Sequence, residues 1–310
     1  MAHVQKMDKI WFDGKMINWD EANVHILTHT LHYGLGVFEG IRCYKGATGH
    51  SAIFRLQEHI DRLYDSAHIS LMTIPFEKSV IVKACQDIFT VNKLDEGYLR
   101  PIAFMGDGEM GLHAVSNPIR VAVIAWPWGT YLGDDGVKKG IRAKISSYTR
   151  LNVNVNLPKA KICGNYINSI WAKREAVLAG YEEAILLDAE GYIAEASGEN
   201  VFIVKNGEVM TPPKGSSILP GITRDTVLTL LRELGVPIRE ERITRDMAYV
   251  ADELFLTGTA AEITPVRELD NRTIGTGKPG PITQQIQSLY FDLVRGKNAA
   301  HAGWLKQIER

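Results

Sequence analysis

Two lysines stand directly before a glycine and the start of an expected helix, in the run Lys159-Ala160-Lys161-Ile162-Cys163-Gly164. A lysine in a partly buried site can form a Schiff base with a carbonyl compound. Most lysines are exposed, so the alternative is two solvated side chains on a loop. The run therefore offers an amine nucleophile, and either lysine could supply it.

A second run, Leu219–Asp225 (LPGITRD), opens the segment Ile222–Leu234, which has helical periodicity. Gly221 lets a ligand approach the backbone, and the hydroxyl of Thr223 joins the N–H groups of the first turn. Such a helix terminus is a good phosphate site. The alternative is that Thr223 is an ordinary first-turn residue.

Two further segments offer groups for an anion and for a cation. The small residues of Leu256–Glu262 (LTGTAAE) leave backbone N–H groups accessible to a carboxylate or phosphate, or else form a tight turn between strands. Glu195 lies in an apolar, strand-like segment, where burial of a carboxylate is costly unless a cation pairs with it. A protonated pyridine ring would be such a cation. The alternative places Glu195 on the solvent face of an edge strand.

The spacing of other motifs disfavours several chemistries. His32–Arg42 is glycine-rich but lacks the dinucleotide-binding spacing, and Gly275–Gly280 (GTGKPG) lacks that of a P-loop and is interpreted as a solvated turn. His29 and His32 have no acidic or sulfur ligand near them in the sequence, so we expect no metal site. No Gly-x-Ser-x-Gly motif is present, which argues against a serine hydrolase.

Composition limits the class of protein. The chain has 310 residues, of which 45% are hydrophobic and 23% charged, and its formal net charge is −1. Near-neutrality argues against nucleic-acid or membrane-surface binding, because both need a basic excess. Three scattered cysteines, Cys43, Cys85 and Cys163, indicate a reducing compartment, and the N-terminus does not resemble a signal peptide. No apolar run reaches the roughly 18 residues of a membrane span. We therefore expect a cytoplasmic protein of the α/β or α+β class.

Strands alternate with amphipathic helices, and the length suggests roughly two domains. Asp13-Gly14 predicts a hairpin turn. Helices are expected at 57–70, 76–91, 165–179, 222–234, 244–250 and 281–294, and strands at 98–105, 120–126, 141–147, 183–187, 192–196, 200–204, 208–211, 236–242 and 253–257. Gly129–Gly140 lacks hydrophobic periodicity and is interpreted as the linker region. The predicted division is a domain at 1–132, a linker at 133–140 and a domain at 141–310.

Together, a Schiff-base lysine, a carboxylate for a ring nitrogen and a helix N-terminus for a phosphate are what pyridoxal 5′-phosphate (PLP) requires of a protein. Six motifs also follow one another in a familiar order: LHYGLGVFEGIRCY (31–44), YLRP (98–101), KICGNY (161–166), EASGENVF (195–202), LPGITRD (219–225) and GTAAEITPV (258–266). On these motifs the chain resembles the class IV aminotransferases, PLP enzymes of fold type IV. Within that family it is similar to the bacterial branched-chain aminotransferases, from Ile10 to about Trp304.

The resemblance implies a fold and a set of cofactor contacts. The fold is the two-domain, D-amino-acid-aminotransferase-like α/β (α+β) fold, with a smaller N-terminal domain, a larger C-terminal domain that carries the lysine, and PLP between them. Lys161 resembles the catalytic Schiff-base lysine, whereas Lys159 does not, and Glu199 is then a framework residue. The implied cofactor-binding residues are Lys161, Arg62, Gly221, Ile222, Thr223 and Thr259 (the last five at the phosphate), Tyr166 at the ring hydroxyl, Glu195 at the ring nitrogen and Leu219 on the ring face.

The resemblance also implies a substrate pocket. Its implied residues are Tyr33, Phe38, Trp128 and Tyr131 as an apolar wall, Tyr98 and Arg100 as the pair typical of the branched-chain subgroup, and the N–H groups of Thr259 and Ala260 at the substrate α-carboxylate. Arg100 would reach the γ-carboxylate of glutamate. The loop Gly106–Ala114 is expected to close over a site, of its own subunit or of a neighbour.

The activity implied is reversible, ping-pong transamination of L-leucine, L-isoleucine and L-valine with 2-oxoglutarate, the last step of branched-chain amino acid biosynthesis. The expected partners are small amino acids and 2-oxo acids, with no nucleic acid, no membrane and no metal. A homo-oligomer is expected, either a dimer or a hexamer built as a trimer of dimers. The alternatives are a D-amino-acid transaminase or aminodeoxychorismate lyase of the same fold, and a phosphate-ligand-binding protein that keeps only the scaffold.

Overall fold

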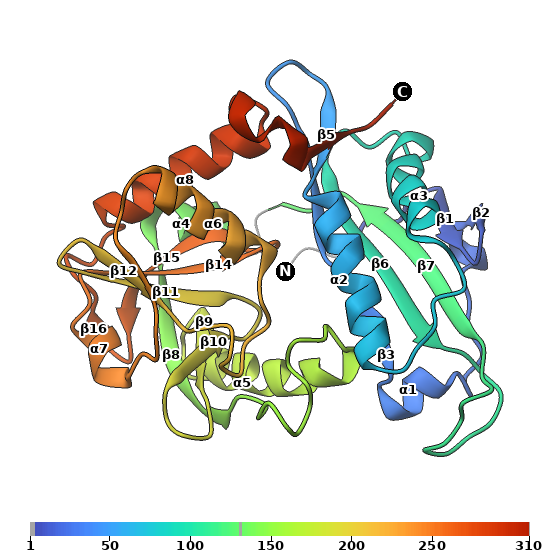
Figure 1. The fold of residues 1–310 in the computed structure, drawn as a ribbon, viewed down its shortest axis with the longest axis horizontal. Helices are drawn as coiled ribbons and strands as arrows, with labels where there is room; N and C mark the ends of the chain where they lie inside the picture. Colours follow the sequence, from blue (N-terminus) through green and yellow to red (C-terminus); the bar gives the residue numbers. More distant parts are fainter. Residues whose placement is uncertain (1–3, 130–131, 310) are drawn as a thin grey trace. The chain divides into compact units, whose positions relative to one another are not determined.

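The computed structural model describes residues 4–129 and 132–309, and the chain divides into two compact units (Figure 1). The first unit comprises Met1–Gly129, Ala160–Gly164 and Asp292–Arg310. The second comprises Thr130–Lys159 and Asn165–Phe291. Each unit is built on a β-sheet of its own.

The first unit contains the strands β1 (Lys9–Phe12), β2 (Lys15–Asn18), β3 (Gly36–Phe38), β4 (Ile41–Lys45), β5 (Ser51–Phe54), β6 (Gly97–Met105), β7 (Ile119–Trp126) and β17 (Leu305–Gln307). They pair antiparallel in the order β17-β5-β4-β6-β7-β1-β2, with β3 on β6. Asp13 and Gly14 have positive φ angles in the β1–β2 turn, so the predicted hairpin is confirmed. β17 is the C-terminal strand, and its pairing with β5 completes a sheet of N-terminal strands.

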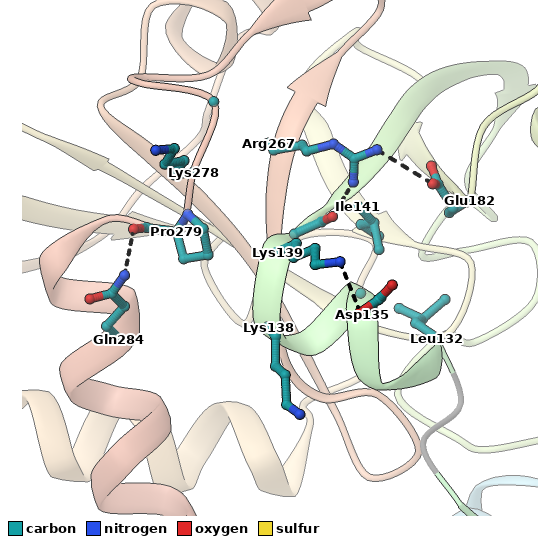
Figure 2. A pocket seen from close by; sticks show the side chains of 13 residues that line it. Leu132, Asp135, Lys138, Lys139, Ile141, Glu182, Arg267, Lys278, Pro279 and Gln284 are labelled. Carbon is teal, nitrogen blue, oxygen red and sulfur yellow. Dashed lines mark hydrogen bonds and ion pairs between the residues drawn. The ribbon is translucent and has the colours of Figure 1, made fainter.

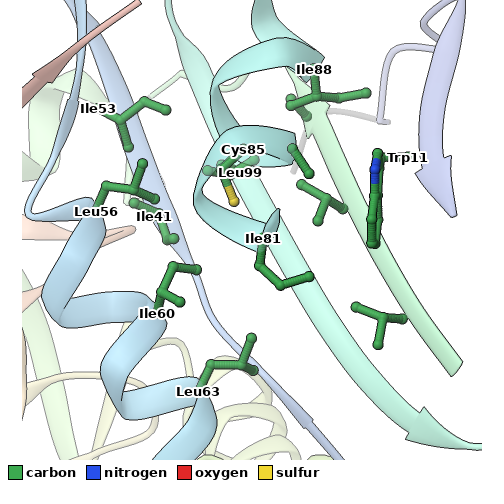
Figure 3. Close-up of a cluster of buried hydrophobic side chains, with 14 of the residues drawn as sticks. Trp11, Ile41, Ile53, Leu56, Ile60, Leu63, Ile81, Cys85, Ile88 and Leu99 are labelled. Carbon is green, nitrogen blue, oxygen red and sulfur yellow. The ribbon is translucent and has the colours of Figure 1, made fainter. Parts of the chain in front are cut away.

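The helices of the first unit are α1 (His29–Tyr33), α2 (Leu56–Ile69) and α3 (Lys78–Val91), with 3-10 turns at η1 (Trp19–Glu21) and η3 (Ala299–Trp304). α2 and α3 pack on each other, and α3 also packs on β1, β6 and β7. Apolar residues recur at helical spacing along both helices and therefore face the sheet. The core they form includes Leu56, Ile60 and Leu63 of α2, Ile81, Cys85 and Ile88 of α3, and Ile41, Ile53 and Leu99 of the sheet (Figure 3).

The second unit contains β8 (Ile141–Thr149), β9 (Glu183–Leu187), β10 (Ile193–Ala196), β11 (Asn200–Lys205), β12 (Glu208–Thr211), β13 (Ile238–Glu240), β14 (Glu253–Gly258), β15 (Glu262–Leu269) and β16 (Arg272–Thr273). Their order is β10-β9-β8-β15-β14-β11-β12-β13, with β16 on β15. β10 also pairs with β11, so this sheet closes into a ring in the order β10-β9-β8-β15-β14-β11. The strands β12 and β13 lie outside the ring. β8 is parallel to both β9 and β15.

The helices of the second unit are α4 (Gly133–Lys139), α5 (Tyr166–Leu178), α6 (Ile222–Glu233), α7 (Arg245–Tyr249) and α8 (Pro281–Val294), with the turn η2 (Cys163–Asn165) before α5. α4 packs on β15, α5 on β8 and β9, and α6 on β13 and β14. α8 begins in the second unit and ends in the first. In the described part of the chain, no helix is long and apolar enough to cross a membrane.

The predicted linker is wrong in part, because Gly133–Lys139 form helix α4. Glycines and paired aspartates lower helix propensity, but packing on β15 overrides it. The predicted domain 141–310 also differs from the second unit, because Ala160–Gly164 and Asp292–Arg310 group with the first. Both segments pair with strands that are distant in sequence, and such pairing leaves no signal in the local sequence. The expected strand 236–242 is shorter in the structure, at β13.

A residue distant in sequence caps the N-terminus of α8. Glu253 accepts hydrogen bonds from the N–H and hydroxyl of Thr283, at 2.7 and 2.6 Å, and from the N–H of Ile282, at 3.1 Å. Gly280 makes this approach possible, since a Cβ there would lie 2.1 Å from the carboxyl carbon of Glu253. The glycine-rich turn before α8 is thus packed against Glu253, which gives it a structural role.

Replacement of Glu253 by alanine should lower the free energy of unfolding by about 1–3 kcal/mol, because the first-turn N–H groups of α8 lose a buried acceptor. Urea unfolding followed by circular dichroism measures the change. Glu253→Gln is the matched control, because the amide keeps the shape and one acceptor oxygen, and it should cost less. A Glu253→Ala variant as stable as the parent chain would contradict this role for the cap.

Candidate active site

The lysine segment Ala160–Gly164 is held within the first unit by backbone hydrogen bonds. The N–H of Phe38 donates to the carbonyl of Lys161 at 3.1 Å, and Val37 and Ile162 form an antiparallel bridge. The N–H of Lys161 donates to Oγ of Ser66 on α2 at 3.0 Å. The expectation that Lys161 belongs to the C-terminal domain is therefore wrong, because the segment pairs with β3.

The two lysines have different surroundings. Nζ of Lys159 donates to the carbonyls of Ser216 and Ile218 at 2.6 and 3.0 Å. Burial lowers the pKa of Lys159, against the nearby charge of Glu195. Nζ of Lys161 lies 5.1 Å from the centroid of the Phe38 ring. Lys159 thus anchors a loop of the second unit, and the assignment of Lys161 as the reactive lysine stays a prediction.

Arg62 is paired with a buried carboxylate in the first unit. Its Nε and Nη2 donate to the two oxygens of Glu39 at 2.7 and 2.8 Å, and Nδ1 of His59 donates to the same carboxylate at 2.8 Å. Burial favours the neutral form of Glu39, but the Arg62 charge and these hydrogen bonds hold its pKa below the usual range. Burial lowers the pKa of His59 despite the neighbouring carboxylate. Glu39 is therefore ionised, and His59 is neutral at neutral pH.

Glu195 is buried on β10 and already has a cationic partner within the protein. Nε and Nη2 of Arg150 lie 2.8 and 2.7 Å from its Oε1. Its Oε2 accepts the N–H of Leu219 at 3.0 Å and Nδ2 of Asn200 at 3.4 Å. The solvent-face alternative for Glu195 is therefore wrong. Arg150 is itself oriented by a hydrogen bond to Oδ1 of Asn168 at 3.1 Å.

A second buried acid lies near this pair along the chain. Burial, the charge of Glu183 and, to a lesser extent, that of Glu195 raise the pKa of Glu199 to about 8. Glu183 is itself ion-paired to Lys173 at 2.5 Å and accepts the hydroxyl of Ser197 at 2.6 Å. Glu199 is thus largely protonated at neutral pH, which suits a framework residue.

The N-terminus of α6 is built around a close approach between Gly221 and Asn200. A Cβ at position 221 would lie 2.1 Å from Oδ1 of Asn200, whose Nδ2 donates to the carbonyl of Leu219 at 2.9 Å. The missing Cβ at Gly221 therefore makes room for a side chain of the protein, and the expected approach of a ligand to this backbone stays a prediction. Gly221 is the N-cap residue and supplies no side-chain cap, and Thr223 is buried.

The other expected cofactor residues occupy turns and helix ends of the second unit. Tyr166 is the first residue of α5. Thr259 and Ala260 lie in the short turn between β14 and β15, where Gly258 pairs with Glu262. The segment thus forms a tight turn between two strands, and Thr259 and Ala260 are both partly exposed in it.

Aromatic side chains surround Arg100 on the first sheet. Its guanidinium lies 4.6 Å from the Phe38 ring, 5.4 Å from Tyr98 and 6.0 Å from Trp126. The ring of Trp128 lies 4.4 Å from that of Tyr98 in a T-shaped contact. Nε of Arg100 is buried without a hydrogen-bond partner in the described residues. The structure thus brings together four of the expected substrate residues: Phe38, Tyr98, Arg100 and Trp128.

Tyr33 and Tyr131 are the remaining residues of the expected apolar wall. Tyr131 lies outside the described residues. Tyr33 ends α1 and is 45% exposed, with its ring 4.5 Å from that of His29. Nε2 of His29 lies 2.8 Å from the carbonyl oxygen of Gly111, which joins α1 to the predicted closing loop.

Sequence reasoning missed the partners of the expected residues, namely Arg150, Glu39, His59 and Asn200. Glu39 lies within the first motif, and its place beside β3 was the available signal. His59, Arg62 and Ser66 recur at helical spacing on α2, which indicates one polar face. Arg150 follows β8 without any local pattern, so only the folded chain reveals it as the partner of Glu195.

A pocket of about 760 Å³ in the second unit has no part in this arrangement. It is lined by Leu132, Asp135, Gly136, Lys138, Lys139, Gly140, Ile141, Glu182, Arg267, Gly277, Lys278, Pro279 and Gln284. None of these was expected at the active site. Lys139 pairs with Asp135, Arg267 with Glu182, and Lys138 and Lys278 point in different directions (Figure 2). Its cations therefore do not converge on one point.

No group of three or more His, Cys, Asp or Glu side chains in residues 4–129 and 132–309 could hold a metal ion. The first unit offers a lysine, an arginine-held carboxylate and an aromatic-lined arginine. The second unit offers another arginine-held carboxylate and a helix N-terminus. These are the residues that the six motifs carry or contact.

Comparison with known proteins identifies the family. The family described as "Amino-transferase class IV" matches residues 36–269. A branched-chain-amino-acid aminotransferase of Pseudomonas aeruginosa is 51% identical over 304 residues, which cover 98% of each chain. The crystal structure of the Escherichia coli branched-chain amino acid aminotransferase matches with a TM-score of 0.95 at 45% identity, covering 98% of this chain and 100% of that one. That of the Thermobaculum terrenum branched-chain amino acid aminotransferase in its PLP form matches with a TM-score of 0.90 at 36% identity, covering 98% and 99%. The chain belongs to the class IV aminotransferases.

Proposed function

We propose that this chain transfers the amino group of L-leucine, L-isoleucine and L-valine to 2-oxoglutarate, using PLP, to give branched 2-oxo acids and L-glutamate. One observation in the second unit carries the proposal. Glu195 accepts the N–H of Leu219, and α6 begins three residues later at Ile222, so a buried carboxylate lies close to a helix N-terminus. These groups suit the two ends of PLP, its ring nitrogen and its phosphate. The relatives named above are branched-chain aminotransferases.

The residues present fit PLP by the chemistry of their donors and acceptors. Arg150 is ion-paired to Glu195, and a nearby opposite charge favours the ionised form of a carboxyl group, the form that can hold a protonated ring nitrogen. The phosphate would be held by Arg62, Thr223, Thr259 and first-turn N–H groups at Gly221 and Ile222. Tyr166 would hydrogen-bond the ring hydroxyl, and Leu219 would pack on the ring. When bound, PLP supplies an electron sink that stabilises negative charge at the substrate Cα.

Lys161 is the proposed catalytic residue. Its backbone is fixed on both sides, by Phe38 and by Ser66, so its side chain starts from a defined position. Nζ, once free of the cofactor, takes the proton from the substrate Cα as a general base. No metal and no nucleotide is needed for this proton transfer.

The substrate pocket would combine an apolar wall with two anion sites. Tyr33, Phe38, Tyr98, Trp128 and Tyr131 would form the wall for the branched side chain. Arg100 would bind the γ-carboxylate of glutamate, and an anion there would satisfy its buried Nε. The N–H groups of Thr259 and Ala260 would bind the α-carboxylate that all substrates share.

An exposed apolar surface supports assembly with a second copy of the chain. Ile26 is 72% exposed, Leu31 61% and Leu112 94%. His29, which lies between Ile26 and Leu31, contacts the carbonyl oxygens of Gly106 and Gly111, so the segment of Ile26 and Leu31 is joined to the segment of Leu112. Exposed apolar side chains on neighbouring segments are typical of an interface. The proposed assembly is a dimer at least, and it can extend to a hexamer. Free cysteines support a reducing location, and we assign the chain to the cytoplasm.

An amino-donor panel tests the activity. Purified protein with PLP and 2-oxoglutarate should form glutamate from L-leucine, L-isoleucine and L-valine, faster than from D-alanine. No turnover with any of the three would overturn the proposal. Faster turnover of D-alanine would favour a D-amino-acid transaminase, release of pyruvate from aminodeoxychorismate would favour the lyase, and phosphate binding without turnover would favour a binding protein.

Exchange of each lysine for alanine tests the assignment of Lys161. Lys161→Ala should lower kcat by about 10²–10⁴-fold or more and abolish covalent retention of PLP after borohydride reduction, because Nζ is both the attachment point and the base. Lys159→Ala should retain the attachment, since Nζ of Lys159 binds two carbonyls of its own unit. Mass spectrometry measures the retention, and the opposite pattern would reassign the lysine.

A charge placed on the apolar surface tests the assembly. Leu112→Asp should reduce the molar mass in solution to that of one chain, measured by light scattering during size-exclusion chromatography, because an aspartate cannot be buried there unpaired. Leu71→Asp is the matched control, since Leu71 is also 94% exposed but lies at the end of α2. An unchanged mass for Leu112→Asp would show that this surface is not the interface.

A further inference from the structure

The buried carboxylate of Glu39 takes no part in the proposed proton transfer or in the proposed contacts with cofactor and substrate. Glu39 is 0% exposed and directly follows β3, and its N–H donates to the carbonyl of Pro101 on β6 at 2.9 Å. Burial of a carboxylate is costly, so its place has to be explained by the groups it holds. Those groups are His59 and Arg62, one helical turn apart on α2.

The contact between Glu39 and Arg62 fixes the orientation of the guanidinium as well as its distance from the carboxylate. Because Nε and Nη2 donate to the two oxygens of one carboxylate, the plane of the guanidinium is set by the plane of that carboxylate. The direction of the third nitrogen, Nη1, is then set as well. A single hydrogen bond would leave the guanidinium free to rotate about it.

The helix α2 ties this arrangement to the lysine segment. Ser66 lies four residues after Arg62 on the same helix and accepts the N–H of Lys161 at 3.0 Å. Positions four apart lie on one helix face. Glu39 itself follows Phe38, whose N–H donates to the carbonyl of Lys161 at 3.1 Å. Arg62 and Lys161 are therefore held in one rigid frame, in which Glu39 fixes the orientation of the arginine.

We propose that Glu39 is a positioning residue, which sets the orientation in which Arg62 meets the phosphate of the cofactor. The proposal rests on the proposed function, because that function assigns Arg62 to the phosphate. His59 supports the same carboxylate from its other side through Nδ1.

Two explanations of the role of Glu39, its charge and its orienting contact with Arg62, predict opposite effects on phosphate binding when Glu39 is replaced. If only charge mattered, loss of a carboxylate beside Arg62 would strengthen phosphate binding, because the net positive charge there would rise. If orientation matters, Glu39→Gln weakens binding, since the amide N–H₂ faces a donor of Arg62 and the paired contact is lost. The sign of the change therefore separates the two explanations.

The test is a spectral titration of the full chain, freed of cofactor, with PLP and with pyridoxal, which lacks the phosphate. Glu39→Gln should weaken PLP binding by about 10- to 100-fold and change pyridoxal binding by less than about threefold. In an Arg62→Lys background, Glu39→Gln should have little further effect on PLP, because a lysine has no plane to orient. Glu58→Gln is the matched control, since it removes a carboxylate from Arg55 on the same helix, and it should bind both compounds as the parent chain does.

Three results would overturn the proposal: tighter or unchanged PLP binding by Glu39→Gln, equal weakening for PLP and pyridoxal, or additive effects with Arg62→Lys. If Glu39→Gln does not fold, Glu39→Asp replaces it, because the shorter side chain retracts from Arg62 but keeps the charge. It should show the same selective loss for PLP, and equal weakening of both compounds would again overturn the proposal. A parent chain that binds pyridoxal but not PLP would overturn the phosphate assignment of Arg62 itself, and a chain that binds neither would overturn the proposed function.

Discussion

A carboxylate removed from water needs a cation, and this constraint organises both units of the chain. In the second unit Arg150 holds Glu195, and in the first unit Arg62 holds Glu39. The partners are 45 and 23 residues apart in sequence, so each pair joins segments that local structure would leave independent. In each pair one member is a residue expected to meet the cofactor. Burial of the other member holds that residue in place before any ligand arrives.

Hydrogen bonds near these ion pairs also fix the backbone of neighbouring segments. In the second unit, Glu195 also accepts the N–H of Leu219, and Nδ2 of Asn200 donates to the carbonyl of Leu219. The loop before α6 is therefore positioned by the acid of β10. In the first unit, β3 and α2 hold the lysine segment by its N–H and its carbonyl. The groups assigned to the two ends of the cofactor are thus positioned through hydrogen bonds within each unit.

Local patterns predicted most of the regular elements, because these depend on periodicity and turn residues. α8 begins and ends at the predicted residues, and α6 ends one residue early. Patterns failed where contacts between distant segments decide the structure. α4 forms in a glycine-rich segment because it packs on β15. The lysine segment belongs to the first unit because it pairs with β3, although the residues on both sides of it in sequence belong to the second.

The candidate residues followed from motif resemblance, whereas their partners did not. Arg150 carries no pattern that singles it out, and Gly221 shows in sequence only that space is needed, not that Asn200 fills it. A glycine, a buried acid or a buried arginine each signals a close approach, but the approaching group is a property of the fold. This is why the sequence indicated which residues could act, and only the folded chain shows what holds each of them.

The presence of buried ion pairs in both units needs an explanation beyond stability. An apolar replacement of a buried ion pair is often neutral or stabilising, so stability alone does not account for two such pairs. In the second unit another buried acid, Glu199, is kept largely neutral by burial and by the charge of Glu183. Glu195 differs from Glu199 because Arg150 supplies the compensating charge, and only an ionised acid can hold a protonated ring nitrogen. Arg150 therefore favours the charged form of Glu195, which is the form that the proposed function needs at the ring nitrogen.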